Sequence, residues 1–230
     1  GVPAFRRLKL HCHAPIDGAM TFIDEMLNLV MPGRCVVCAS PALVVRWRVL
    51  CGSCVDALPT GVGRVIGPSS IIETVSLGPY EGPLGILVRE AKYERNLALI
   101  DQLGVRLGVA LRGRFDVDAI VSVPIPQGRL WRRGFDQGER IGRGVSAATG
   151  IPYTSLLRRQ GSETQVGKTA AQRRKLPIRA ISVSDGPLPP RVLLVDDVRT
   201  TGSTLHAAAR ALHRRGVPHI WAATLSHQGG

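Results

Sequence analysis

Two adjacent carboxylates and a run of hydroxyl side chains form the stretch of this 230-residue sequence best suited to chemistry. Asp196 and Asp197 come directly after the apolar run 192–195, and a short turn follows them. The turn contains Thr200, Thr201, Gly202, Ser203 and Thr204. Its backbone N–H groups, with a helix N-terminus behind them, can cradle an anion, and Gly202 lets the backbone approach a phosphate closely.

The acid pair indicates what else such a ligand must carry. Carboxylates beside a phosphate are unfavourable unless the ligand also offers hydroxyl groups or brings Mg2+, and a sugar phosphate meets that condition. The stretch therefore predicts a sugar-phosphate site at the carboxyl end of a buried strand, where ligands bind in open α/β sheets. A strand that ends in an ordinary helix cap, where Asp and Thr are common, is the plainer alternative.

Four of the five cysteines form two close pairs, Cys35-x2-Cys38 and Cys51-x2-Cys54. Two such pairs at this separation place four thiolates around one tetrahedral ion, and Zn2+ is the usual choice. Four protein ligands leave no open position, so we expect a structural site. An iron–sulfur cluster on the same thiolates, a redox pair or four unrelated thiols are the alternatives. Cys12 lies outside the two pairs. This use of cysteine is typical of proteins in the reducing cytoplasm, where we expect this protein.

The hydrophobic pattern predicts the elements that must position these residues. Short apolar runs alternate with stretches of helical period, which favours a parallel α/β sheet flanked by helices. We expect an N-terminal domain over residues 1–60 and a second domain over residues 61–230. Strands are predicted at 71–77, 119–123, 154–157, 191–195 and 219–225, and helices at 16–31, 83–95, 97–112, 138–149 and 205–215.

The charge balance is strongly basic, with 30 Lys and Arg against 17 Asp and Glu. Residues 116–230 alone hold 17 basic and 8 acidic side chains. The positive potential of such a surface attracts phosphate groups, either on a small substrate or along a nucleic acid. A basic surface that contacts only solvent has the same composition. Apolar residues make up 44%, which excludes a wholly disordered chain. We expect neither a secretory signal nor a membrane span, because no apolar stretch reaches about 20 residues.

Residues 192–205 closely resemble the phosphoribosyl-pyrophosphate signature of the type I phosphoribosyltransferases. By that resemblance, Asp196 and Asp197 hold the ribose hydroxyls as the catalytic pair, and the turn 200–204 holds the 5′-phosphate. The motif order extends the resemblance to the ComF family, in which a small zinc-ribbon-type module precedes a phosphoribosyltransferase-like domain. The matching pieces are the four cysteines, Tyr80-Glu81-Gly82-Pro83-Leu84 with Lys92, Val123-Pro124-Ile125-Pro126, Arg133-Gly134-Phe135-Asp136-Gln137, Gln165 and Arg173-Arg174.

The resemblance also implies roles for two basic segments. A loop after one strand binds pyrophosphate in related transferases, and a long polar segment forms a lid that excludes water. The residues concerned here are Pro124, Ile125, Arg129 and Arg133 in the loop, and Gln165, Lys168 and Arg173 in the lid. Two departures from the family pattern are Asp136, where Asn is more common, and residues 175–177, which lack an expected Asn.

Together these features predict a Mg2+-dependent phosphoribosyltransferase that acts on an unidentified acceptor. The ComF resemblance links it to natural competence, DNA uptake and other competence proteins. The alternative is a protein that binds single-stranded DNA, in which the phosphoribosyl-pyrophosphate site is regulatory or vestigial. An aromatic content of 4% counts against a base-stacking surface, and the acid pair counts for sugar-phosphate binding. A purely structural zinc adaptor would explain only residues 34–54.

Overall fold

The computed structural model describes residues 34–40, 50–93, 96–125, 130, 134–159 and 181–228. The chain divides into two compact units, residues 1–58 and residues 59–230. The predicted helix at 16–31 and Cys12 lie outside the described residues. In the smaller unit, the one described helix is α2 (Gly52–Asp56), which begins just after Cys51.

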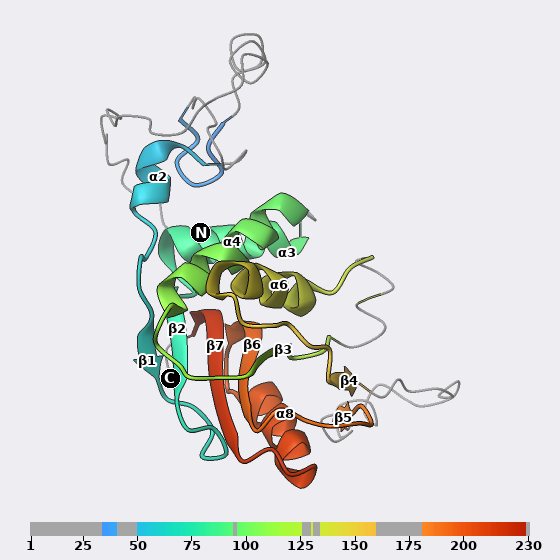
Figure 1. Ribbon diagram of the computed structural model, residues 1–230. Helices are drawn as coiled ribbons and strands as arrows, with labels where there is room; N and C mark the ends of the chain where they lie inside the picture. Colours follow the sequence, from blue (N-terminus) through green and yellow to red (C-terminus); the bar gives the residue numbers. More distant parts are fainter. Residues whose placement is uncertain are drawn as a thin grey trace, which may run out of the picture. The chain divides into compact units, whose positions relative to one another are not determined.

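A five-stranded sheet forms the centre of the larger unit (Figure 1). Four neighbouring strands are parallel, and the edge strand β1 pairs antiparallel with β2. In spatial order the strands are β1 (Gly63–Val65), β2 (Thr74–Pro79), β7 (His219–His227), β6 (Arg191–Arg199) and β3 (Ala119–Ser122). A separate two-stranded antiparallel sheet joins β4 (Leu157–Arg159) and β5 (Ile181–Val183).

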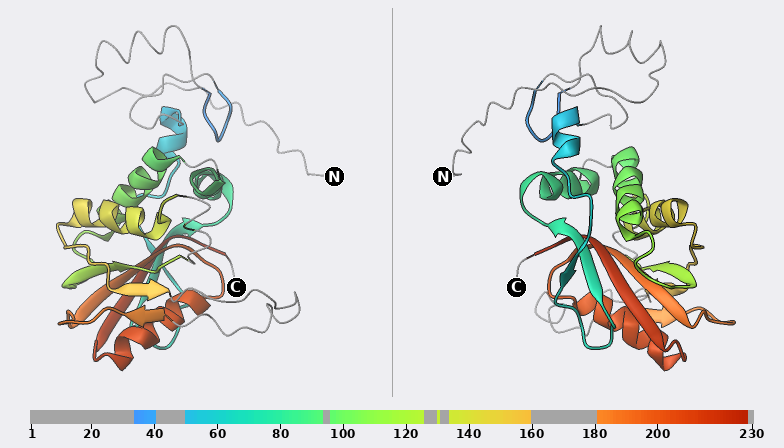
Figure 2. Two further views of the ribbon diagram at one scale, coloured as in Figure 1. Left: turned by 90° about the vertical axis from the view of Figure 1, so that its right-hand side faces the viewer. Right: turned by 60° about the vertical axis from the view of Figure 1, so that its left-hand side comes forward.

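Helices cover both faces of the central sheet. One face carries α3 (Gly82–Tyr93), α4 (Leu97–Leu111) and α6 (Gln137–Thr149), and the other carries α8 (Ser203–Arg214) (Figures 1 and 2). No described helix is long and apolar enough to cross a membrane. The larger unit is therefore a predominantly parallel α/β sheet with helices on each side, which is the predicted fold class.

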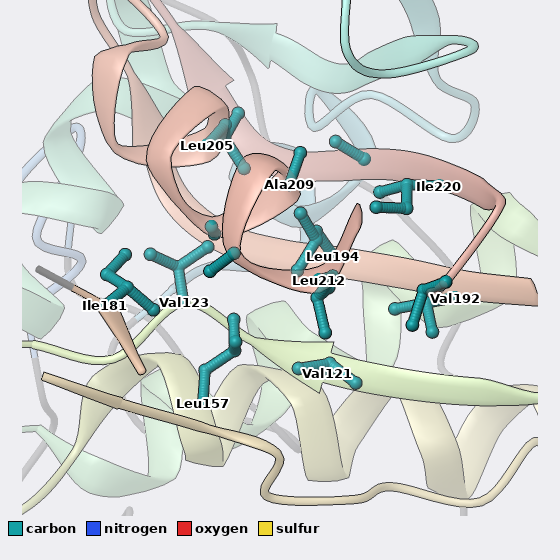
Figure 3. Packing of buried hydrophobic residues seen from close by; sticks show 14 of the residues in the cluster. Val121, Val123, Leu157, Ile181, Val192, Leu194, Leu205, Ala209, Leu212 and Ile220 are labelled. Carbon is teal, nitrogen blue, oxygen red and sulfur yellow. The ribbon is translucent and has the colours of Figure 1, made fainter. Parts of the chain in front are cut away.

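The central strand β6 is apolar on both of its faces because helices cover each face. Val192 and Leu194 pack against Leu205 and Leu212 of α8 (Figure 3). Leu193, between them in sequence, is only 1% exposed. The sequence of a strand buried on both faces is a continuous run of apolar residues, without alternating polar ones. That burial anchors the strand that carries the acid pair.

Glycines bring α4 and α6 unusually close to each other. A Cβ atom on Gly144 would lie 2.8 Å from the backbone carbon of Gly104, and one on Gly108 would lie 2.8 Å from the Cα atom of Val145. Real Cβ atoms do not approach backbone atoms so closely, so each of these positions requires glycine. The close crossing lets α6 run beside β3 with its N-terminus at the carboxyl end of the sheet.

The predicted strands needed three corrections. The central strand does not end at residue 195, because its pairing with β7 continues to Arg199. The strand predicted at 154–157 is instead an isolated bridge between Tyr153 and Ile120, followed by β4. No strand was predicted before residue 71 or between residues 157 and 191, yet these segments contain β1 and β5. The remaining predicted strands and helices of the larger unit form with shifted ends.

Candidate functional site

A cleft of about 350 Å3 opens at the carboxyl ends of the central strands. Segments that follow four of these strands line the cleft, together with the start of α6 and the end of β4. The cleft contains Pro124 and Ile125 after β3, Asp196 and Asp197 within β6, and Thr200 and Thr204 after it. Residues predicted from separate motifs thus share one cavity. Its place in the sheet is where ligands bind in parallel α/β folds.

The two acids stand in different electrostatic surroundings. Asp197 Oδ2 lies 2.8 Å from Nζ of Lys92, at the end of α3, and each of these side chains is only 17% exposed. The backbone N–H of Asp197 donates to Asp196 Oδ1 at 2.8 Å. Burial, reinforced by the neighbouring Asp197 charge, raises the pKa of Asp196 to about 8. One acid is therefore ion-paired, and the other favours its neutral form near pH 7.

The hydroxyl-rich turn has the backbone of an anion cradle. Gly202 has φ of 75°, a left-handed conformation that favours glycine, and it caps α8 without a side-chain hydrogen bond. The Ser203 N–H makes only a 3.4 Å contact with Thr201 Oγ1, and the first N–H bonded within the helix is that of His206, to Gly202 O. Early N–H groups of α8 therefore remain available to an anion.

A second pocket of about 20 Å3 lies in the turn itself. Gly202, Ser203 and Thr204 line it, whereas Thr201 lines neither cavity. Thr201 instead donates from its hydroxyl to Ser203 Oγ at 3.1 Å. Thr201 thus orders the turn, while its neighbours border the space that a ligand could fill.

Asp136 fixes the loop after β3 against α6. Its side chain caps α6 by accepting from the Glu139 N–H at 3.2 Å. Burial raises the pKa of Asp136, while hydrogen bonds from the backbone N–H groups of Glu139, Gly138 and Ile125 oppose that rise. The Glu139 N–H contact uses Oδ1, an acceptor that an Asn side chain also has. The helix cap therefore does not depend on the departure from the family's usual Asn.

Several cleft residues, among them Tyr80, Gln228 and Arg159, were not predicted as site residues. Tyr80 follows β2, Gln228 follows β7, and Arg159 ends β4. Arg159 and Lys92 supply positive charge that acts on Asp196 and opposes the rise of its pKa. The rule that ligands bind at the carboxyl ends of parallel strands could have identified Tyr80 and Gln228, had the strand ends been known. The other predicted residues, Arg129, Arg133, Gln165, Lys168 and Arg173, lie outside the described residues.

The four paired cysteines gather in the smaller unit. Their sulfur atoms all lie within 4.8 Å of one another, and Cys38 Sγ is 3.6 Å from Cys51 Sγ. Tetrahedral zinc with bonds of about 2.3 Å needs sulfurs roughly 3.8 Å apart, so the cluster could hold a zinc ion. Burial raises the pKa of Cys51 to about 11 and raises that of Cys54 as well. These two thiols therefore favour the protonated form, and a metal ion that binds them must displace their protons.

Comparison with known proteins identifies a domain family and several relatives. The phosphoribosyl transferase domain family matches residues 137–229. DNA utilization protein YhgH of Salmonella typhi is 29% identical over 227 residues, which cover 84% of this chain and 96% of that protein. Among solved structures, an adenine phosphoribosyltransferase is 16% identical with a TM-score of 0.35 and covers 75% of this chain and 89% of that chain. A likeness that weak carries no argument.

The family follows from another relative. Competence protein F of Haemophilus influenzae is 34% identical over 181 residues, which cover 74% of this chain and 75% of that protein. Identity at this level over most of both chains confirms the family predicted from the motif order. The chain therefore belongs to the competence protein F (ComF) family, with a phosphoribosyltransferase-type domain in its larger unit.

Proposed function

We propose that the cleft binds phosphoribosyl pyrophosphate together with Mg2+, and that the protein transfers the phosphoribosyl group to an acceptor used in natural competence. One observation carries the proposal: the acid pair, the hydroxyl-rich turn and the loop after β3 border the same cleft. Each of these groups suits one part of the ligand. The names of the relatives, competence protein F and DNA utilization protein, support a role in handling DNA.

In the proposed complex, each part of the ligand has its own place in the cleft. The 5′-phosphate lies in the turn, where the N–H groups of α8 and the hydroxyls of Ser203 and Thr204 donate to it. The ribose hydroxyls lie on Asp196 and Asp197. The pyrophosphate lies beside Ile125 and Gly138, at the N-terminus of α6, where the helix dipole favours negative charge.

The carboxylates of Asp196 and Asp197 are hard oxygen donors of the kind that Mg2+ accepts, directly or through water. Bound Mg2+ supplies charge neutralisation for the leaving pyrophosphate. Lys92 and Arg159 add positive charge to the same cleft. These residues hold the ligand and offset its charge, which is the main protein contribution when a phosphate-rich leaving group departs.

The transfer breaks the bond between C1 of the ribose and the pyrophosphate oxygen, which keeps the electron pair. The acceptor atom supplies the electron pair of the new bond to C1 and then loses its proton. The expected transition state resembles an oxocarbenium ion, which electronegative oxygens near the ribose stabilise. The protein's part is to position the ribose on the acid pair and to keep the phosphates in place.

Calorimetric titration with phosphoribosyl pyrophosphate, with and without Mg2+, tests the proposal. We expect Mg2+-dependent binding by the wild type and a loss of at least about tenfold in affinity for the double variant Asp196→Asn with Asp197→Asn. Asp185→Asn is the control, because Asp185 is fully exposed and lies outside the cleft. Equal affinity of the double variant and the wild type would reject the site.

Binding of single-stranded DNA is the second candidate function. The relative named DNA utilization protein covers 84% of this chain, and the net charge is +13. A protein that binds DNA through phosphate contacts loses affinity steeply as salt rises. Titration of labelled single-stranded DNA at several salt concentrations, with and without phosphoribosyl pyrophosphate, separates the two functions. Salt-sensitive DNA binding without any binding of phosphoribosyl pyrophosphate would favour this candidate.

A further inference from the structure

Arg199 occupies an unusual position beside the hydroxyl-rich turn. It is the last residue of β6 and lines the small pocket together with Thr200, Gly202 and Ser203. Its Nε atom lies 3.8 Å from the point where a Cβ atom on Gly202 would stand. The side chain of Arg199 therefore lies against the turn that precedes α8.

The guanidinium of Arg199 has a buried donor without an acceptor. Its Nε atom is out of contact with solvent and has no hydrogen-bond partner among the described residues. Within the part of the chain that the structure describes, no ion pair with Arg199 occurs either. Buried donors in folded proteins are nearly always paired, and an unpaired one attached to a cation is especially costly.

We propose that Arg199 is a further phosphate-binding residue, and that its missing acceptor is the 5′-phosphate of the sugar phosphate. The inference rests on the proposed function and deepens it. An arginine offers several donors in a planar fork that fits phosphate oxygens. With Arg199 on one side and the first turn of α8 on the other, the phosphate receives donors from two directions. Arg199 thus adds a full positive charge to a cradle otherwise built from neutral groups.

A solely structural role for Arg199 predicts different behaviour. A structural arginine would have a carboxylate or carbonyl partner, and its removal would weaken the fold. Here the described residues offer no such partner, so Arg199→Met should leave the melting temperature of the ligand-free protein unchanged or raise it. The substitution keeps the backbone carbonyl of residue 199, which accepts the Gln228 N–H at 2.9 Å.

Titrations with three separate ligands test the inference: ribose 5-phosphate, pyrophosphate and inorganic phosphate. For Arg199→Met we expect ribose 5-phosphate to bind roughly ten- to a hundredfold more weakly, as for a lost charged hydrogen bond. Pyrophosphate should bind as it does to the wild type. Arg210→Met is the matched control, because Arg210 is exposed on α8 and lines neither pocket.

The outcomes separate this inference from the proposed function. Unchanged affinity of Arg199→Met for ribose 5-phosphate overturns the role of Arg199 while the wild type still binds phosphoribosyl pyrophosphate. A wild type that binds no phosphoribosyl pyrophosphate overturns the proposed function itself, and the assignment of Arg199 falls with it. If inorganic phosphate binds as tightly as ribose 5-phosphate and both weaken equally, the pocket recognises phosphate alone, which overturns the assignment to a sugar phosphate.

Discussion

At the scale of single residues, the acid pair shows how neighbours in sequence acquire different properties. Asp197, on strand β6, is ion-paired with Lys92 of helix α3, whereas Asp196 is half-buried beside the charge of Asp197. The sequence predicted that both acids belong to a site, because the motif and its spacing are local. Their separate ionisation depends on Lys92 and Arg159, which only folding brings to the cleft. Residue types predict a site, but its electrostatics depend on the fold.

The raised pKa of Asp196 predicts a pH-dependent stability. The folded state holds the proton of Asp196 more tightly than the unfolded state does. The resulting stabilisation of the fold is complete below the ordinary Asp pKa of about 4. The stabilisation is lost as the pH rises toward about 8, the pKa in the folded protein. Asn cannot ionise, so the Asp196→Asn variant does not lose stability in this way. Its free energy of unfolding, relative to that of the wild type, should therefore increase across this pH window by at most about 1.4 kcal/mol per pH unit.

Denaturant unfolding of ligand-free protein at pH 5, 7 and 9 measures this difference. Asp185→Asn serves as the control, because Asp185 is fully exposed and its substitution removes the same charge. A stability difference between Asp196→Asn and the wild type that stays constant from pH 5 to pH 9 would contradict the assigned ionisation.

At the scale of elements, long periodic segments were predicted well and short ones poorly. The apolar run 192–195 predicted the central strand, yet β6 continues to Arg199 because backbone pairing with β7 persists beyond the run. The strands β1, β4 and β5 contain three residues each, too few to show a period. Their existence depends on tertiary pairing rather than on local preference.

The crossing of α4 and α6 gives a prediction at this scale. Ala normally stabilises a helix relative to Gly, but a Cβ atom on Gly144 would lie 2.8 Å from the backbone of Gly104 and Val105. The helices must separate to admit it, and overpacking of this kind costs about 1–3 kcal/mol. We therefore expect Gly144→Ala to lower the free energy of unfolding by about that amount, measured by urea denaturation.

The matched control for this crossing is Val109→Ala on α4. Val109 is 47% exposed, so its truncation should change the free energy of unfolding by less than about 0.5 kcal/mol. A Gly144→Ala variant as stable as the wild type would show that the two helices are not held at the distance that the structure gives.

At the scale of the whole molecule, the two units differ in what stabilises them. The larger unit has an extensive apolar core on the α8 face of its sheet. In the smaller unit, the buried apolar side chains among the described residues are Leu50, Leu58 and three of the paired cysteines. In units of fewer than about 60 residues, a bound metal commonly supplies part of the stability. The paired cysteine spacing predicted the ligand cluster because such spacing is a local property of the chain.

Loss of metal should therefore affect the two units differently. Metal analysis of purified protein should find zinc, and Cys35→Ser should lower the zinc content and the melting temperature of the smaller unit in a calorimetric scan. Because residues 59–230 have their own core, the variant should keep its affinity for phosphoribosyl pyrophosphate. Cys12→Ser, which removes a thiol outside the two pairs, is the control. Purified wild type with neither zinc nor iron would contradict the metal site, and loss of ligand affinity in Cys35→Ser would contradict the independence of the units.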